Sequence, residues 1–371
     1  MPNLIYLYTS GGAPKCDMTM FPDYEGQAQT SHRLAVAAQS DGMIHMFKTL
    51  AQEHYVDRFV ALIDSTVCPG NLSIGPHSSI HVIPSMSCAA QFIAPGDIVI
   101  VRGGFKPWIP LLDYIHTKQQ NWILFYRANT NRQGWPYWDI ILNDLINTPQ
   151  AIRGRLNFNF TKPVNEDIFG VIDSPSTIPK EYDIMIGASH IHRKKGQHLT
   201  VQALQQYYHI YGTKPKAILP GGYMRCSTNQ IIQNIIRSGD VDIEGPMHLS
   251  RSQLALAMNR SKLFVHAGYG GQNDRGILEA MCCGCVPLLF GKRNVSPIIW
   301  NSSIHIGQEP KAIAHSISLA LDWYPALEHY TNYTCINGLH EVAIPKMLRL
   351  LEFIAQNPKP GRQKAIEEFI Q

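Results

Sequence analysis

The sequence predicts an α/β protein made of two doubly wound domains, each with a Rossmann-like, mainly parallel sheet covered by helices. Two observations carry this prediction. Short apolar runs alternate with amphipathic segments along the chain, which is typical of successive βαβ units. The length of 371 residues exceeds one ordinary core and suits two domains of about 150 to 180 residues each. In such sheets ligands gather at the carboxyl ends of the strands, so we expect the functional residues there.

Composition indicates where the domains meet. The first domain is expected over residues 1–170 and the second over 182–356. Between them, residues 171–181 contain two prolines with Asp, Ser and Thr, which is typical of a linker. The last segment, 357–371, begins with a Pro-Lys-Pro-Gly pivot and is expected to form a helix.

Apolar runs predict the strands, and segments of helical periodicity predict the helices. In the first domain we expect strands at 4–8, 59–63, 80–83, 98–101, 122–126 and 156–160, and a helix at 108–118. In the second domain we expect strands at 182–187, 217–219, 241–245, 263–265, 286–290 and 304–306. Its helices are expected at 197–208, 228–238, 250–259, 274–283, 311–321 and 341–356, with a terminal helix at 363–370.

Charge and residue usage exclude several classes of function. The formal net charge of +4 is small for this length and gives no electrostatic support for nucleic-acid binding. Sixteen histidines are scattered without the spacing of metal ligands, so we expect no metal site. No apolar run approaches the roughly 18 residues of a membrane span, and the first eight residues lack the basic region of a signal peptide. We therefore expect a cytoplasmic protein.

The sequence contains eight cysteines, and we expect a reducing compartment. Three of them, Cys282, Cys283 and Cys285, fall in an apolar helix-to-strand junction. We expect these three to be buried free thiols.

The chain is organised around residues 263–290, which read as a strand, a glycine loop, a helix and a second strand. A glycine loop that leads into a helix offers free backbone N–H groups and the positive end of the helix dipole, which suit a phosphate. Glu279 lies on this helix, so one element combines an anion cradle with a carboxylate.

Residues 277–287, ILEAMCCGCVP, resemble the LEAMACGxPVV signature of retaining nucleotide-sugar glycosyltransferases with the GT-B fold, family 4 type. In that family the Glu matching Glu279 binds the ribose of the nucleotide. The family's second carboxylate, eight positions upstream, is Gly271 here, and its role passes to Asp274 or to backbone amides. The resemblance assigns the donor phosphate and sugar to the loop residues Gly270, Gly271, Gln272 and Asn273.

A second similarity lies at the start of the second domain, where residues 187–196, GASHIHRKKG, resemble the family's "vGR…KG" motif. The resemblance places Gly187 at the donor site and gives Lys195 the donor diphosphate. Ala188 occupies the position of the family's Arg, so Arg193 or Lys194 supplies the second charge. A diphosphate leaving group gains negative charge as the glycosidic bond breaks, which cations stabilise. The alternative is an ordinary basic, solvated turn.

The resemblance implies two further donor contacts. Backbone after a glycine reads the base in this family, which indicates Gly245 and Met247. A glycine turn ahead of the first helix approaches the phosphate, which indicates Gly26 rather than Gly11 and Gly12, although ordinary turns explain these glycines equally well.

Polar residues at strand ends of the first domain are candidates for the acceptor side: Arg102, Lys106, Arg127 and Asn129. Two aromatic segments, 106–108 and 135–138, indicate either a peripheral membrane contact or exposed aromatics at an oligosaccharide site.

The resemblance implies a retaining, metal-independent glycosyltransferase without a cofactor, whose two domains face an interdomain cleft. It also implies that the C-terminal helix, within 357–371, crosses back to the first domain. Such an enzyme would move a sugar from a nucleotide-diphosphate donor to a hydroxyl of a glycan or a lipid-linked acceptor, a reaction of carbohydrate biosynthesis. Two alternatives stay open. A GT-B nucleotide-sugar 2-epimerase would need acid and base side chains near the sugar, for which Asp274, His190 and His192 are available. A catalytically silent nucleotide-sugar-binding protein would explain the missing carboxylate at position 271.

Overall fold

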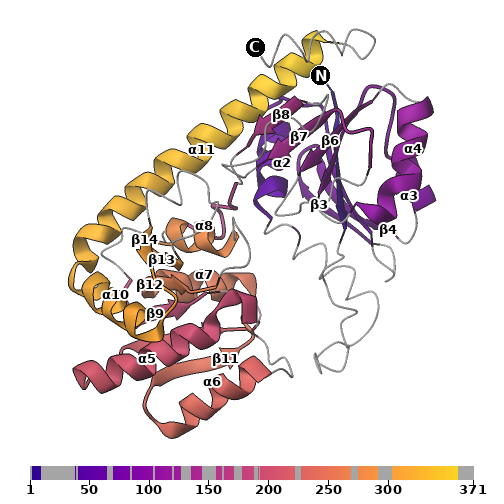
Figure 1. Ribbon diagram of the computed structural model, residues 1–371. Coiled ribbons are helices and arrows are strands. Elements are labelled where there is room, and N and C mark those ends of the chain that lie inside the picture. The colour runs from indigo at the N-terminus through magenta and orange to yellow at the C-terminus, as the bar shows by residue number, and fades with distance from the viewer. Residues whose placement is uncertain are drawn as a thin grey trace. The chain divides into compact units, whose positions relative to one another are not determined.

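The computed structural model describes residues 2–9, 38, 41–64, 70–83, 86–102, 105–118, 121–126, 135–143, 156–160, 163–170, 178–187, 191, 193–221, 227–268, 275–290 and 303–357. The chain forms two compact units, each with its own sheet (Figure 1). Unit 1 comprises Met1–Pro163 and Glu341–Gln371, and unit 2 comprises Val164–His340.

Unit 1 contains an eight-stranded sheet in the order β3-β4-β2-β1-β5-β6-β7-β8. Every neighbouring pair is parallel except β3 and β4, which are antiparallel. The strands are β1 (Leu4–Thr9), β2 (Phe59–Asp64), β3 (Gly70–Gly75), β4 (Ser78–Ile83), β5 (Ile98–Arg102), β6 (Trp122–Tyr126), β7 (Ile140–Asn143) and β8 (Leu156–Asn159).

The helices of unit 1 cover both faces of this sheet. They are α2 (Gly42–Gln52), α3 (Met86–Ala90), the short 3-10 helix η2 (Lys106–Trp108), α4 (Ile109–Lys118) and the C-terminal part of α11 (Tyr324–Gln356). Successive side chains of a strand point to opposite faces, so Leu4 and Tyr6 of β1 join one core and Ile5 and Leu7 join the other.

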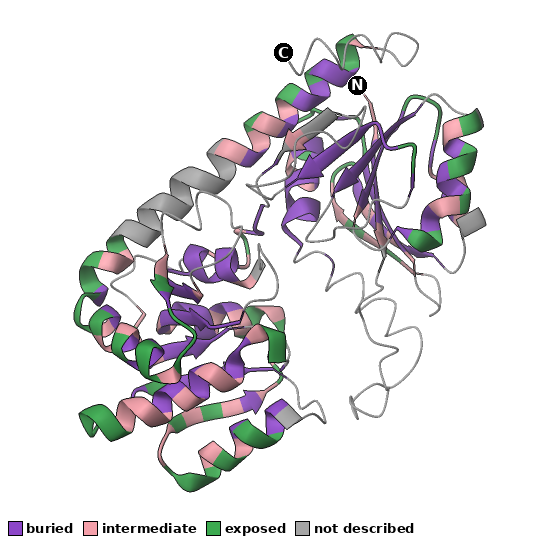
Figure 2. Cartoon of the chain, viewed as in Figure 1, coloured by how far each residue is buried: buried purple, intermediate pink, exposed green. Residues whose placement is uncertain are grey.

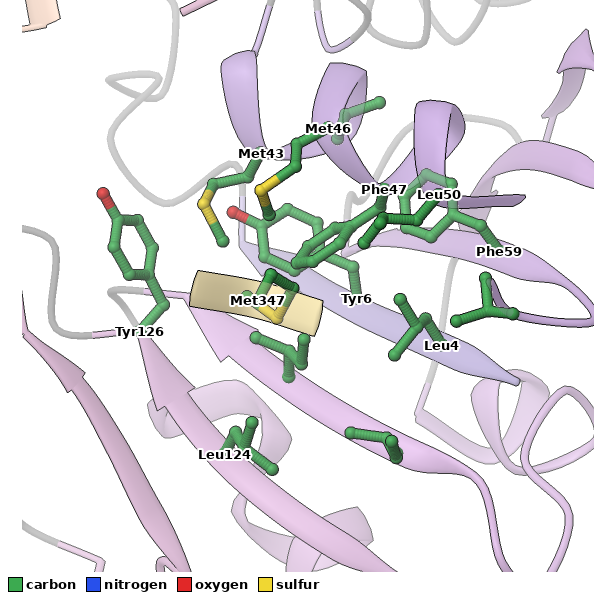
Figure 3. Packing of buried hydrophobic residues seen from close by; sticks show 14 of the residues in the cluster. Leu4, Tyr6, Met43, Met46, Phe47, Leu50, Phe59, Leu124, Tyr126 and Met347 are labelled. Atoms are coloured by element: carbon green, nitrogen blue, oxygen red, sulfur yellow. The ribbon is translucent and has the colours of Figure 1, made fainter. Parts of the chain in front are cut away.

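The first of these cores packs α2 and α11 against the sheet. Figure 3 shows Phe47 and Leu50 of α2 and Met347 of α11 gathered around Leu4 and Tyr6 of β1. All five side chains are buried. Because parallel strands are covered on both faces, their sequences are continuous apolar runs rather than alternating ones.

Unit 2 contains a six-stranded sheet in the order β11-β10-β9-β12-β13-β14, and all its neighbouring strands are parallel. The strands are β9 (Tyr182–Ile186), β10 (Lys216–Pro220), β11 (Asp242–Met247), β12 (Ser261–His266), β13 (Val286–Phe290) and β14 (Ile304–Ile306). The helices are η3 (Arg193–Lys195), α5 (Gln197–Tyr211), α6 (Ser227–Ser238), α7 (Arg251–Asn259), α8 (Arg275–Cys282), α10 (Pro310–Asp322) and the first part of α11.

Two cores lie on opposite faces of this sheet. Side chains of α7 and α8 pack with Met185 and Phe264, whereas those of α5, α6 and α10 pack with Ile184, Ile186 and Val265. Figure 2 shows the strands of both sheets largely buried and the outer helices buried on one side only. Unit 2 is therefore doubly wound, as predicted.

The structure confirms the predicted strands with shifts of one to two residues at their ends, and it adds two that the sequence analysis missed, β3 and β7. The predicted helix at 341–356 is wrong in its start, because α11 begins at Tyr324 and continues through Pro345. The first boundary between the units lies between residues 163 and 164, whereas the sequence indicated residue 170. The second boundary lies inside α11, between residues 340 and 341, whereas the sequence indicated residue 356. The predicted terminal helix, 363–370, lies outside the described residues.

Candidate functional site

The carboxyl ends of β9, β10, β11 and β12 lie at one edge of the unit 2 sheet, because neighbouring strands are parallel. Each strand except β11 runs directly into a glycine or an Ala-Gly pair, and β11 carries Gly245 near its end. A sheet edge of this kind is where α/β folds bind ligands.

The basic turn η3 lies directly against the end of β12. Gly196, which follows η3, has φ +76°, and a Cβ built on it would come within 2.6 Å of the Gly268 Cα. A Cβ built on Gly268 would in turn overlap the backbone of Lys194 and Lys195. Two glycines therefore permit a backbone-to-backbone contact that no other residue pair allows. This contact joins the three basic residues to the start of the loop that leads to α8.

The N-terminus of α5 adds to the positive electrostatic potential of this region. The Arg193 and Lys194 side chains are exposed and Lys195 is half-buried. Burial, and after it the charge of Arg193, lower the pKa of His198 on the same turn. Because α5 is 15 residues long, its N-terminus also contributes the positive end of a helix dipole. This arrangement suits an anion such as a diphosphate.

Glu279 of α8 is 2% exposed and forms an ion pair with Arg251, the first residue of α7. The Arg251 guanidinium also lies over the ring of Phe169, 4.5 Å from its centroid. A cationic partner offsets part of the desolvation cost of an ionised carboxylate that is buried. The predicted ribose-binding carboxylate is thus held from a neighbouring helix.

The sequence analysis missed Arg251, although a signal was present. Ser250 caps α7 through a capping box with Gln253, and that makes Arg251 the first helical residue. A cation in the first turn opposes the helix dipole, which predicts a nearby carboxylate partner.

Two predicted donor-site glycines have structural roles. Gly187 donates its N–H to Val265 O at 2.8 Å, and a Cβ on it would lie 2.7 Å from the Phe264 ring. Gly245 has φ +116°, and its Cβ would lie 2.5 Å from the Leu219 carbonyl oxygen. Both glycines allow close strand packing at the sheet edge. Met247, at the end of β11, accepts a hydrogen bond from Gly221 N through its carbonyl at 2.8 Å.

Half of the predicted site lies outside the described residues. This group comprises Gly26, Arg127, Asn129, Gly270, Gly271, Gln272, Asn273 and Asp274. Their assignments stay predictions from the resemblance.

In unit 1, Arg102 forms an ion pair with Asp41, and its guanidinium lies 5.1 Å from the centroid of the Tyr8 ring. Asp41 is also the N-cap of α2, where its side chain accepts a hydrogen bond from Met43 N at 2.9 Å. Arg102 therefore contributes to the structure at the end of β5. Lys106, in η2, is exposed.

The prediction that both aromatic segments are exposed is wrong for their tryptophans. Trp108, Trp135 and Trp138 are at most 2% exposed and belong to the core beneath α4. The Trp135 indole donates a hydrogen bond to Asp113 at 2.8 Å. Tyr137, the fourth aromatic residue of these two segments, is exposed, at 47%. Tryptophan runs next to prolines here fill the core and form no binding surface.

The three cysteines of the α8–β13 junction are buried free thiols, as predicted. Burial raises the pKa of the Cys285 thiol to about 12, and the thiol donates a hydrogen bond to Met258 O at 3.0 Å. Within the described ranges there is no cluster of His, Cys, Asp or Glu side chains that could bind a metal ion. No helix in that same part of the chain is both long and apolar enough to cross a membrane.

No protein-family model matches the sequence, and no curated protein matches it. Solved structures do match. A sucrose-phosphate synthase from Thermosynechococcus elongatus aligns with 96% of this chain and 100% of its own, at 12% identity and a TM-score of 0.65. A glycosyltransferase from Rickettsia africae ESF-5 aligns with 96% of this chain and 99% of its own, at 14% identity and a TM-score of 0.62.

A third match is HepE of Anabaena in complex with UDP and glucose, which covers 96% of this chain and 100% of its own, at 13% identity and a TM-score of 0.62. Likeness at such low identity establishes the fold alone. The chain therefore has the GT-B fold, two Rossmann-like α/β units, as the sequence motifs implied.

Proposed function

We propose that this protein is a retaining glycosyltransferase that moves a sugar from a nucleoside-diphosphate sugar to a hydroxyl group of a glycan or a lipid-linked acceptor. The observation that carries the proposal is the contact between Gly196 and Gly268. It joins three cations to the loop before α8, and α8 carries the buried carboxylate Glu279. A diphosphate and a ribose are the two parts of a donor that need these two groups.

In the proposed reaction, Lys195 and Arg193 lie beside the donor diphosphate. As the bond between the sugar and the diphosphate breaks, the leaving group gains negative charge, and these cations stabilise it without a metal ion. Glu279 binds the ribose hydroxyls. The acceptor attacks from the face that the leaving group vacates, which retains the anomeric configuration, and the leaving phosphate takes the acceptor proton. Asp274 or backbone amides of residues 270–273 hold the sugar.

The base of the donor and the residue that contacts the acceptor are inferred from different observations. HepE binds UDP and UDP-glucose, so uridine is the first base to test here. On the acceptor side, Lys106 is the described candidate that remains exposed, because Arg102 is engaged with Asp41.

A thermal-shift titration with UDP, GDP, dTDP and CDP tests the donor class. A ligand at about a hundred times its Kd stabilises the folded protein by roughly 2.7 kcal/mol. We expect one nucleotide to stabilise the wild type and to lose this effect in Lys195→Ala and Glu279→Ala. Lys216→Ala is the matched control, because Lys216 begins β10 at the opposite edge of the sheet. If none of the four nucleotides changes the melting curve, the proposal is wrong.

Retention needs its own measurement. Once a donor is identified, the anomeric configuration of the first product can be read by NMR before it equilibrates. A product whose configuration is inverted relative to the donor contradicts the retaining mechanism. Turnover of the donor sugar without any acceptor, to an epimer, favours the epimerase instead.

A further inference from the structure

We propose that Arg251 is a positioning residue that fixes the Glu279 carboxylate for the ribose hydroxyls of the donor, so that the protein discriminates ribonucleotides from deoxyribonucleotides through this pair. The inference rests on the proposed function, because it assigns a task to the same site. It starts from the ion pair between α7 and α8.

The carboxylate needs this partner because of where it lies. Glu279 is the fifth residue of α8, on a helix whose neighbouring side chains Ile277, Leu278, Ala280 and Met281 are buried. In such surroundings an ionised carboxylate without a cation is strongly destabilised. An ionised carboxylate is also the form that accepts two hydrogen bonds from a diol. Arg251 therefore offsets the cost of placing a charged carboxylate inside an apolar layer.

The arginine is itself held in place from two sides. The capping box of Ser250 and Gln253 fixes the start of α7, with hydrogen bonds of 2.8 and 3.2 Å. The guanidinium lies over Phe169, which is fully buried and whose N–H donates to Asn165 O at 2.9 Å. A planar guanidinium can stack and pair at once, which an ammonium group cannot do equally well.

The pair also lies at the right place in the chain. α7 begins four residues after Met247, the proposed base-side residue, and α8 follows the loop proposed for the phosphates. The ribose of a nucleotide lies between its base and its phosphates. The Arg251–Glu279 pair links the two segments that would hold those neighbouring parts.

The test measures the ratio of two dissociation constants. Isothermal titration gives the Kd of the best-binding nucleoside diphosphate among UDP, GDP, ADP and CDP, and of its 2′-deoxy form. We expect the wild type to prefer the ribonucleotide by about tenfold or more, the effect of a hydrogen bond to a charged group. In Arg251→Gln this ratio should fall close to one. Arg260→Gln is the control, because Arg260 ends the same helix and pairs with Glu181 at an exposed position.

The ratio separates positioning from support of the fold. If Arg251 only stabilises the helices, Arg251→Gln lowers the melting temperature and leaves the ratio unchanged, which overturns the inference. Arg251→Lys keeps the charge and serves if the Gln variant does not fold. It should retain the fold and still lose most of the discrimination, and full discrimination in this variant also overturns the inference.

A double variant tests whether the two residues act together. In Glu279→Gln the ratio should fall as far as in Arg251→Gln, and the combined variant should fall no further. Additive losses contradict the inference. A wild type that binds ribonucleotide and deoxynucleotide equally well also contradicts it, while nucleotide binding itself survives. Absence of all nucleotide binding refutes the proposed function and the inference together.

Discussion

The contact between Gly196 and Gly268 can be tested with two alanine variants. They separate the free-energy cost of the left-handed backbone conformation from the cost of steric overlap. In Gly196→Ala the new methyl group meets both an unfavourable backbone conformation, φ +76°, and the backbone of Gly268. Gly212, at the other end of α5, has φ +71° and no atom within 4 Å of its Cβ position. Gly212→Ala therefore measures the conformational cost alone.

The magnitudes follow from the geometry. An alanine in the left-handed region costs about 1 to 2 kcal/mol relative to glycine. The Cβ on residue 196 would lie 2.2 Å from the Gly268 N, whereas ordinary contact begins at 3.4 Å, so the two backbones must separate by about 1.2 Å. Overpacking of this kind adds about 1 to 3 kcal/mol. We expect a total of about 2 to 5 kcal/mol for Gly196→Ala and about 1 to 2 kcal/mol for Gly212→Ala.

Urea titrations give the free energies of unfolding, and nucleotide titrations on the same proteins give the functional effect. Separating η3 from the end of β12 displaces Lys195, so Gly196→Ala should weaken nucleotide binding about tenfold or more. Gly212→Ala should leave binding unchanged. Gly268→Ala meets the backbone of Lys194 and Lys195 and should behave like Gly196→Ala in binding. If Gly196→Ala costs no more than Gly212→Ala, or if it binds nucleotide normally, the contact does not organise the site.

Three further outcomes are expected. In the free protein, burial and then the charge of Arg193 lower the pKa of His198, and a bound nucleotide diphosphate should raise it. If the NMR signal of His198 titrates identically with and without nucleotide, no diphosphate binds beside η3. The buried Cys285, whose pKa is raised to about 12, should be alkylated far more slowly in the native protein than in the urea-unfolded protein, as measured by peptide mapping. For the half-buried Cys88, the two alkylation rates should differ much less. Tyr182→Phe should lower the stability by about 0.5 to 1.5 kcal/mol at neutral pH, because the phenol donates a 2.5 Å hydrogen bond to the carboxylate of Glu244 on β11, which solvent screens. Burial, and then this hydrogen bond, raise the pKa of Tyr182 from 10.0 to about 12. The stability that the phenol contributes is therefore present below pH 10 and is lost as the pH rises toward 12. If the unfolding free energy of Tyr182→Phe depends on alkaline pH in the same way as that of the wild type, this expectation is wrong.

The sequence predicted most strands because buried parallel strands are continuous apolar runs of about five residues. It missed β7 because its apolar run, Ile140 to Leu142, is only three residues long and is followed at once by the polar Asn143 and Asp144. It missed β3 because this short antiparallel edge strand has glycine at both ends and no fully buried residue, so it lacks an apolar run.

Helix α11 shows the limit of local propensity. Its middle, residues 330–340, contains threonines, asparagines and a glycine, and Pro345 follows, so the sequence favoured a break there. The helix continues through them, and Met347 and Leu350 beyond them are buried in the core of unit 1. Packing at both ends decided the outcome, and a window of local sequence carries no such information.

The site prediction named Glu279 without the residue that pairs with its carboxylate. Glu279 was found through a motif, but its partner Arg251 lies 28 residues earlier, and only the fold brings them together. The tryptophans at 135 and 138 were misread as a surface because an aromatic-rich segment has the same composition in a core and in a binding face.

The path of α11 also determines the order in which the two units can be completed during synthesis. Unit 2 is continuous in sequence, from Val164 to His340. Unit 1 starts at the N-terminus, yet it needs Met347 and Leu350 to cover the face of its sheet that contains Tyr6. A nascent chain therefore makes the eight strands and α2 well before the C-terminal part of α11, so the area of this apolar face that α11 covers stays uncovered while the whole of unit 2 is translated. Unit 1, whose synthesis starts first, is therefore the last to complete its core.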